Sequence, residues 1–131
     1  MATIEMAIHF SVDEKARIVR MRCVDPLGVD EVTAALERQI RDGHWKYGTL
    51  VDARLSGLDY QQSIELFACV RQLVAEHGPN GPVAFVTRSA KHVAGAQTIA
   101  FRGGEISKGF EVFWDVDDAN AWLLKMLGGT P

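Results

Sequence analysis

Five consecutive residues, Arg88-Ser89-Ala90-Lys91-His92, carry the densest group of chemically useful side chains in this sequence. They follow an apolar segment and open a helical pattern, so the cluster is expected at a helix N-terminus. Two cations, a hydroxyl, an imidazole and free amides can together hold a phosphate or a carboxylate. The alternative is an N-cap serine among solvated charges. Because basic residues at a helix start oppose the helix dipole, the cluster gains weight as an anion-binding site.

A second group of candidates lies at and after Asp52. Its carboxylate could orient a cation or a polar ligand, and Arg54 is the alternative partner for it. Ser56 and Ser63 are candidate regulatory serines, because a phosphate near a helix N-terminus is favoured by free amides and the dipole. The alternatives are turn chemistry for Ser56 and a small packed residue for Ser63.

The sequence contains none of the common catalytic or metal-binding motifs. Gly-x-Ser-x-Gly, a P-loop and Gly-x-Gly-x-x-Gly are all absent. The histidines are scattered, and none has helical ligand spacing from another ligand. We therefore expect no enzyme, no catalytic residue, no metal and no cofactor. The histidines are His9, His44, His77 and His92.

Composition narrows the class of protein. A chain of 131 residues with 47% apolar and 24% charged residues is typical of one globular domain, residues 1–131. The net charge of -3 disfavours general nucleic-acid binding. Cys23 and Cys69 form no Cys-x-x-Cys pair and are expected as reduced thiols, although a disulfide stays open. Neither a signal-peptide pattern nor an apolar run of roughly 20 residues occurs, so we expect a cytoplasmic protein without membrane insertion.

Alternating strands and helices must position these residues. Apolar segments at 49–55, 82–87 and 110–114 are each followed by a polar turn and an amphipathic helical pattern. Residues 1–24 have the alternation of a hairpin that reverses at 12–15. The pattern predicts an α/β fold with a mixed, mostly parallel sheet of about five strands and four helices. Sites in such folds lie at the carboxyl ends of the strands, so Asp52 and Arg88 should be neighbours.

Local signals predict where several of these elements start and stop. Asp59 with Gln62 forms a capping-box pair, and Asp30 and Asp115 are candidate N-caps. The basic residues of the second hairpin strand indicate partial exposure or an edge strand protected by charge. They are Arg17, Arg20 and Arg22. Trp45 is expected to fill the core, with partner contact as the alternative.

Four stretches, residues 48–52, 82–86, 109–115 and 118–123, resemble the SpoIIAA-like family of the STAS/SEC14-like fold group. Residues 109–115 and 118–123 are similar to that family's last strand and aspartate-capped helix. Residues 48–52 resemble its central strand, and residues 82–86 resemble the strand that follows. The resemblance covers nearly the whole chain and is carried mainly by packing residues. It implies a mixed sheet of about five strands with four helices, and often a homodimer.

The resemblance also implies a function. STAS domains of anti-sigma-factor antagonists are protein-binding switches, phosphorylated on a serine in an Asp-Ser-Ser-Gly-like motif. That motif is absent here, and Ser63 is its nearest counterpart by position, with Ser56 as a second hydroxyl. The expectation is a non-catalytic, homodimerising module for protein interaction or regulation. The alternative is a small-molecule or lipid carrier with an apolar pocket beneath the third helix, where Arg88 and Lys91 receive an anionic head group.

Overall fold

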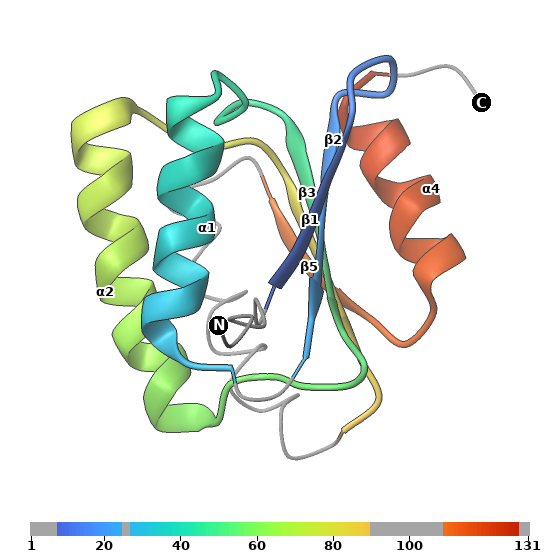
Figure 1. The fold of residues 1–131 in the computed structure, drawn as a ribbon. Helices are drawn as coiled ribbons and strands as arrows, with labels where there is room; N and C mark the ends of the chain where they lie inside the picture. Colours follow the sequence, from blue (N-terminus) through green and yellow to red (C-terminus); the bar gives the residue numbers. More distant parts are fainter. Residues whose placement is uncertain (1–7, 25–26, 90–108, 129–131) are drawn as a thin grey trace, which may run out of the picture.

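A computed structural model describes residues 8–24, 27–89 and 109–128 of the chain. Its strands form a single five-stranded sheet in the order β1-β2-β3-β4-β5 (Figure 1). β1 pairs antiparallel with β2, and every later neighbour is parallel. The predicted hairpin and mixed, mostly parallel sheet are confirmed. The strands are β1 (Ile8–Asp13), β2 (Ile18–Cys23), β3 (Gly48–Ala53), β4 (Val83–Thr87) and β5 (Phe110–Phe113).

Helices cover both faces of this sheet. α1 (Val29–Arg41) and α2 (Tyr60–His77) lie on one face, and α4 (Val116–Met126) lies on the other (Figure 1). These are the three helices of the described ranges. The fourth predicted helix, which would begin near Ser89, lies outside them and stays a prediction. The α/β class is therefore confirmed, and the number of helices is confirmed only for these three.

The two helical layers contact the sheet differently. α4 packs closely on β3, β4 and β5, whereas α1 and α2 pack chiefly on each other and α1 reaches β1. Strand residues alternate between the two faces, as a period of two requires. One buried cluster forms on each face. The α4 side holds Ile18, Leu50, Ala84, Val86, Ala119 and Leu123, and the α1 side holds Ile8, Val19, Met21, Cys23 and Ala35.

Side-chain caps fix the starts of two helices. The Asp59 carboxylate accepts from the Gln62 amide at 2.8 Å, and Gln62 Oε1 accepts from the Asp59 amide, which confirms the predicted capping box. Asp115 caps α4 by accepting from two amides of its first turn. The prediction that Asp30 caps α1 is wrong. That helix begins one residue earlier, and Asp30 lies in its first turn, where the helix dipole favours a carboxylate.

The arginines of β2 have a different role from edge protection. β2 lies between β1 and β3, so it is not an edge strand and that interpretation is wrong. Partial exposure is the correct alternative: Arg20 is half-buried, and its Nη2 donates to Asn120 Oδ1 of α4 at 2.9 Å. The guanidinium thus ties the hairpin to the helix on that face.

Trp45 fills the core as expected. It is buried, and its indole N–H donates to the Gly78 carbonyl at 2.8 Å. Cys23 and Cys69 are free thiols, as expected. None of the helices in the described ranges combines the length and hydropathy of a bilayer-crossing segment.

Candidate functional site

The carboxyl edge of the sheet brings the predicted residues near one another. Asp52 pairs in register with Val86, one residue before the end of β4, so the ends of β3 and β4 are neighbours. Arg88 follows directly and is exposed. The Ser89 amide donates to Thr87 Oγ1 at 3.2 Å. Lys91 and His92 lie outside the described residues, so the predicted anion cluster is described only at its first two members.

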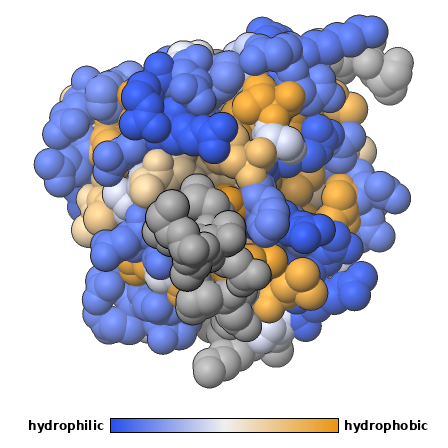
Figure 2. Space-filling view, in the orientation of Figure 1, coloured by the Kyte–Doolittle hydropathy of each residue, from blue (hydrophilic) through white to orange (hydrophobic). Residues whose placement is uncertain are grey.

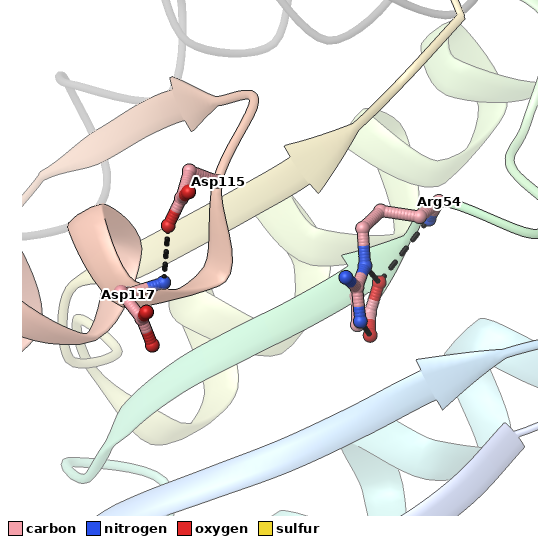
Figure 3. Close-up of polar contacts among 4 residues, drawn as sticks. Arg54, Asp115 and Asp117 are labelled. Carbon is pink, nitrogen blue, oxygen red and sulfur yellow. Dashed lines mark hydrogen bonds and ion pairs between the residues drawn. The ribbon is translucent and has the colours of Figure 1, made fainter.

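Asp52 forms an ion pair with Arg54. Arg54 Nε and Nη2 donate to the two carboxylate oxygens, each at 2.8 Å, and the Arg54 amide adds a third contact at 3.2 Å. Figure 3 shows Arg54 with these bonds at the end of β3, apart from Asp115, which bonds the Asp117 amide. The alternative in which Asp52 pairs with Arg54 is therefore the one found in the structure, and both carboxylate oxygens already accept strong hydrogen bonds.

This pair shifts the titration of both partners. The Arg54 hydrogen bonds hold the pKa of Asp52 below its ordinary value, against the opposing effect of partial burial. The positive charge of Arg22 also lowers the pKa of Asp52. Hydrogen bonding to Asp52 raises the pKa of Arg54 in return, with a smaller contribution from the charge of Asp115. Both groups are therefore stabilised in their charged forms, which is unsuitable for a general acid or base near neutral pH.

The two candidate regulatory serines are both buried. Ser56 follows the end of β3, and Ser63 lies in the first turn of α2. Ser63 also lines a cavity beneath the helix, in agreement with its packing alternative. Their phosphorylation stays a prediction, and a kinase could reach either hydroxyl only after local opening of this edge.

Large apolar side chains stand exposed at the same edge. Leu55 is 67% exposed just beyond β3, Tyr60 is 54% exposed at the start of α2, and Trp114 is 57% exposed directly after β5. Because β3, β4 and β5 are parallel, the segments after them emerge at one end of the sheet. Exposed aromatic and leucine side chains are typical of surfaces that contact other proteins.

A partly open cavity of about 110 Å³ lies between the sheet and the α1–α2 layer. Its strand side includes Val51, Phe85 and Phe110, and its helix side includes Leu36 and Phe67. Figure 2 shows hydrophobic residues between this helical layer and the edge of the sheet, framed by hydrophilic ones. Within the described residues, α1 and α2 contact the sheet more loosely than α4 does, which leaves room for the cavity on their face.

Few polar groups line this cavity. Among the described lining residues none is charged, and those with a hydroxyl or amide side chain are Gln39, Thr49, Ser63 and Asn80. The Cys23 thiol also lines it. Burial raises the pKa of Cys23 to about 12, with a smaller contribution from the charge of Asp52, so the thiol stays protonated and is not a nucleophile.

The sequence analysis predicted an apolar pocket beneath the third helix, which lies outside the described residues, but it did not predict this cavity between the sheet and the α1–α2 layer. Its walls read as ordinary core positions at helical and strand spacing, and Gln39 reads as a polar helix residue. The burial of these two amide side chains is seen only in the structure, where Gln39 is 1% exposed and Asn80 is 8% exposed. Neither the volume left between two layers nor the burial of an isolated amide follows from periodicity.

Comparison with known proteins adds no assignment: no family model, no curated protein and no solved structure matches this chain. Within residues 8–24, 27–89 and 109–128, no group of three or more potential ligands is arranged to hold a metal ion. The cavity and the exposed carboxyl edge are therefore the candidate functional features of the described residues.

Proposed function

We propose that this domain binds a small, neutral, largely apolar molecule in the cavity between the sheet and the α1–α2 layer. The observation that carries the proposal is a volume of about 110 Å³ whose described lining residues carry no charge. An apolar protein cavity of about 150 Å³ stays dry and takes up benzene or xenon, so a void of this order suits a guest the size of one ring.

The absence of charge among the described lining residues also indicates whether the ligand is neutral or charged. A charged head group inside this cavity would lose its hydration without a compensating ion. Arg88 is exposed rather than directed into the cavity wall, and it is not among the residues that line it. The geometry therefore favours a neutral guest over the anionic head group that the sequence suggested.

Xenon tests the proposal because it is apolar and forms no hydrogen bonds. We expect dissolved xenon to shift the methyl NMR signals of Leu36, Leu66 and Val70, which line the cavity. Val70→Phe should abolish these shifts by filling the space. Val74→Phe is the matched control, one turn further along α2 and outside the cavity lining. Shifts spread over surface methyl groups, or shifts unchanged in Val70→Phe, would contradict the proposal.

A second candidate function is protein binding at the carboxyl edge, and a second copy of this chain is the proposed partner. It is favoured by the exposure of Leu55, Tyr60 and Trp114 at one end of the sheet. This role agrees with the function that the SpoIIAA-like resemblance implies, which is a non-catalytic, homodimerising module.

Sedimentation equilibrium separates this candidate from the first. We expect a concentration-dependent dimer that Leu55→Ser combined with Trp114→Ser converts to monomer. Met126→Ser is the control, because Met126 is also exposed but lies at the opposite end of α4. A monomer at every concentration of the unmodified protein would eliminate the homodimer.

A further inference from the structure

The cavity carries two buried hydrogen-bond acceptors that no described protein group uses. Gln39 Oε1 and Asn80 Oδ1 are both inaccessible to solvent, and neither has a hydrogen-bond partner among the described residues. Both side chains line the cavity. An unsatisfied buried acceptor costs roughly 1–3 kcal/mol, so an occupant that supplies a donor recovers part of that cost.

The orientation of the Gln39 amide is fixed by its other bonds. Its Nε2 donates to the His44 carbonyl and to Thr49 Oγ1, each at 3.0 Å. A carbonyl oxygen only accepts hydrogen bonds, so reversing the amide would set two oxygens against each other. Oε1 is therefore the atom left without a partner in the described part of the chain.

Both acceptors belong to the same end of the cavity. Gln39 lies in the last turns of α1 and bonds to Thr49 at the start of β3, and Asn80 precedes the start of β4. The Gly81 amide donates to the Trp45 carbonyl at 3.1 Å, which joins the segment that carries Asn80 to the loop that follows α1. The acceptors thus gather at the amino ends of the strands, opposite the edge where Asp52 and Arg88 lie.

We infer that the ligand of this cavity is a neutral, one-ring-sized molecule with a single polar end that donates a hydrogen bond, as in a phenol or an aromatic alcohol. The inference rests on the proposed function and adds the chemical class of the ligand. The donor is received by Gln39 Oε1 and Asn80 Oδ1, while the apolar body contacts residues such as Phe67 and Phe85. An acceptor-only or anionic end would face two carbonyl oxygens and is disfavoured.

The test compares phenol, toluene and anisole by NMR titration of the cavity methyl groups. Phenol supplies the donor, toluene has no polar group, and anisole has an ether oxygen that only accepts. We expect phenol to bind more tightly than either, although it is the most water-soluble of the three. Replacing Asn80 by leucine should reduce the preference for phenol over toluene about five- to tenfold, which corresponds to one net hydrogen bond.

Two variants guard against a purely structural effect. Thr33→Val removes another buried oxygen without a partner among the described residues, but Thr33 lines a separate groove between α1 and α2 and should leave the phenol preference unchanged. Asn80→Leu should unfold at the same or higher denaturant concentration than the parent, because it removes an acceptor that no described group satisfies. Gln39→Met is less suitable alone, since it also deletes both Nε2 bonds.

The outcomes distinguish the two proposals. If neither xenon nor any of the three aromatics binds, the proposed function fails and this inference fails with it. If toluene binds as tightly as phenol, or Asn80→Leu leaves their ratio unchanged, the cavity binds apolar guests and only the inferred donor is wrong. A crystal structure grown with phenol that contains only water beside Gln39 and Asn80 would also overturn the inference.

Discussion

Asp52 illustrates how a carboxylate at a strand end is used when a guanidinium lies two residues away. Both of its oxygens accept from Arg54, and its pKa is lowered chiefly by those bonds. Because the folded pKa lies below the ordinary value of 3.8, the pair contributes stability above that pH, and the contribution is lost as pH falls through the folded pKa.

Asp52→Asn should therefore lower the free energy of unfolding near neutral pH by less than about 1 kcal/mol, since the Arg54 side chain is 35% exposed and the pair is partly screened. The deficit should shrink in acid, below the ordinary carboxyl pKa. Urea denaturation of both proteins at neutral pH and in acid measures it, with Glu65→Gln on the exposed side of α2 as a control for charge. A deficit that stays constant or grows in acid would show that the ion pair is not its cause.

Residues with local partners could be predicted from sequence, and residues with distant partners could not. Asp59 and Gln62 cap each other within one turn, and the partners of Asp115 are amides two and three residues further along the chain. Gln39 has a partner ten residues away in β3, and its side chain lines the cavity together with that of Asn80. No sequence pattern within a helix reports such a neighbour.

At the scale of elements, two loops determine the polar end of the cavity. Residues 44–47 and 78–81 are joined by the bond from Trp45 to Gly78 and by the bond from Gly81 to Trp45. A methyl group on Gly81 would overlap the carbonyl oxygens of Lys46 and Tyr47. Glycine is required here by close approach of two backbones and not by an unusual backbone angle.

Gly81→Ala should consequently cost about 1–3 kcal/mol of unfolding free energy, as overpacking does, and should shift the fluorescence of buried Trp45. Gly43→Ala is the matched control. Gly43 has a φ of 82° but open space around its Cα, so it should lose only about 1 kcal/mol and leave the Trp45 environment unchanged. Equal losses with no change in fluorescence in either variant would contradict a role for this contact.

Strands and helices could be predicted from the sequence because hydrophobic residues recur with a different period in each. Thr49, Val51 and Ala53 share one face of β3, while Leu50 packs toward α4, and the strand pattern reports that alternation directly. The distance between α2 and the sheet has no such signature. It depends on how α1 and α2 pack on each other, which is a tertiary property.

At the scale of the whole molecule, the two faces of the sheet differ in how completely they are filled. The α4 face is closed by Leu123 and Ala119, which pack on β3 and β4 without exposure to solvent. The opposite face holds the cavity, although the same strands form both surfaces. The binding that we propose uses the face with the cavity, and the closely packed α4 face contributes stability that offsets the unfilled volume.

Two alanines in neighbouring strands test this asymmetry. Ala53 of β3 lines the cavity, whereas Ala84 of β4 lies in the filled cluster beneath α4. Ala53→Val adds methyl groups into empty space, so the unfolding free energy should stay constant or rise by about 1 kcal/mol. Ala84→Val adds the same atoms to a filled core and should cost about 1–3 kcal/mol.

Pressure denaturation gives an independent measure of the same difference, because the volume change of unfolding scales with the void that unfolding eliminates. Ala53→Val should make that volume change less negative and weaken xenon binding. Ala84→Val should leave xenon binding in place in the molecules that remain folded. If the two variants were equally destabilised and both kept the original volume change, the empty space would not lie on the α1–α2 face, and a ligand site there would have no physical basis.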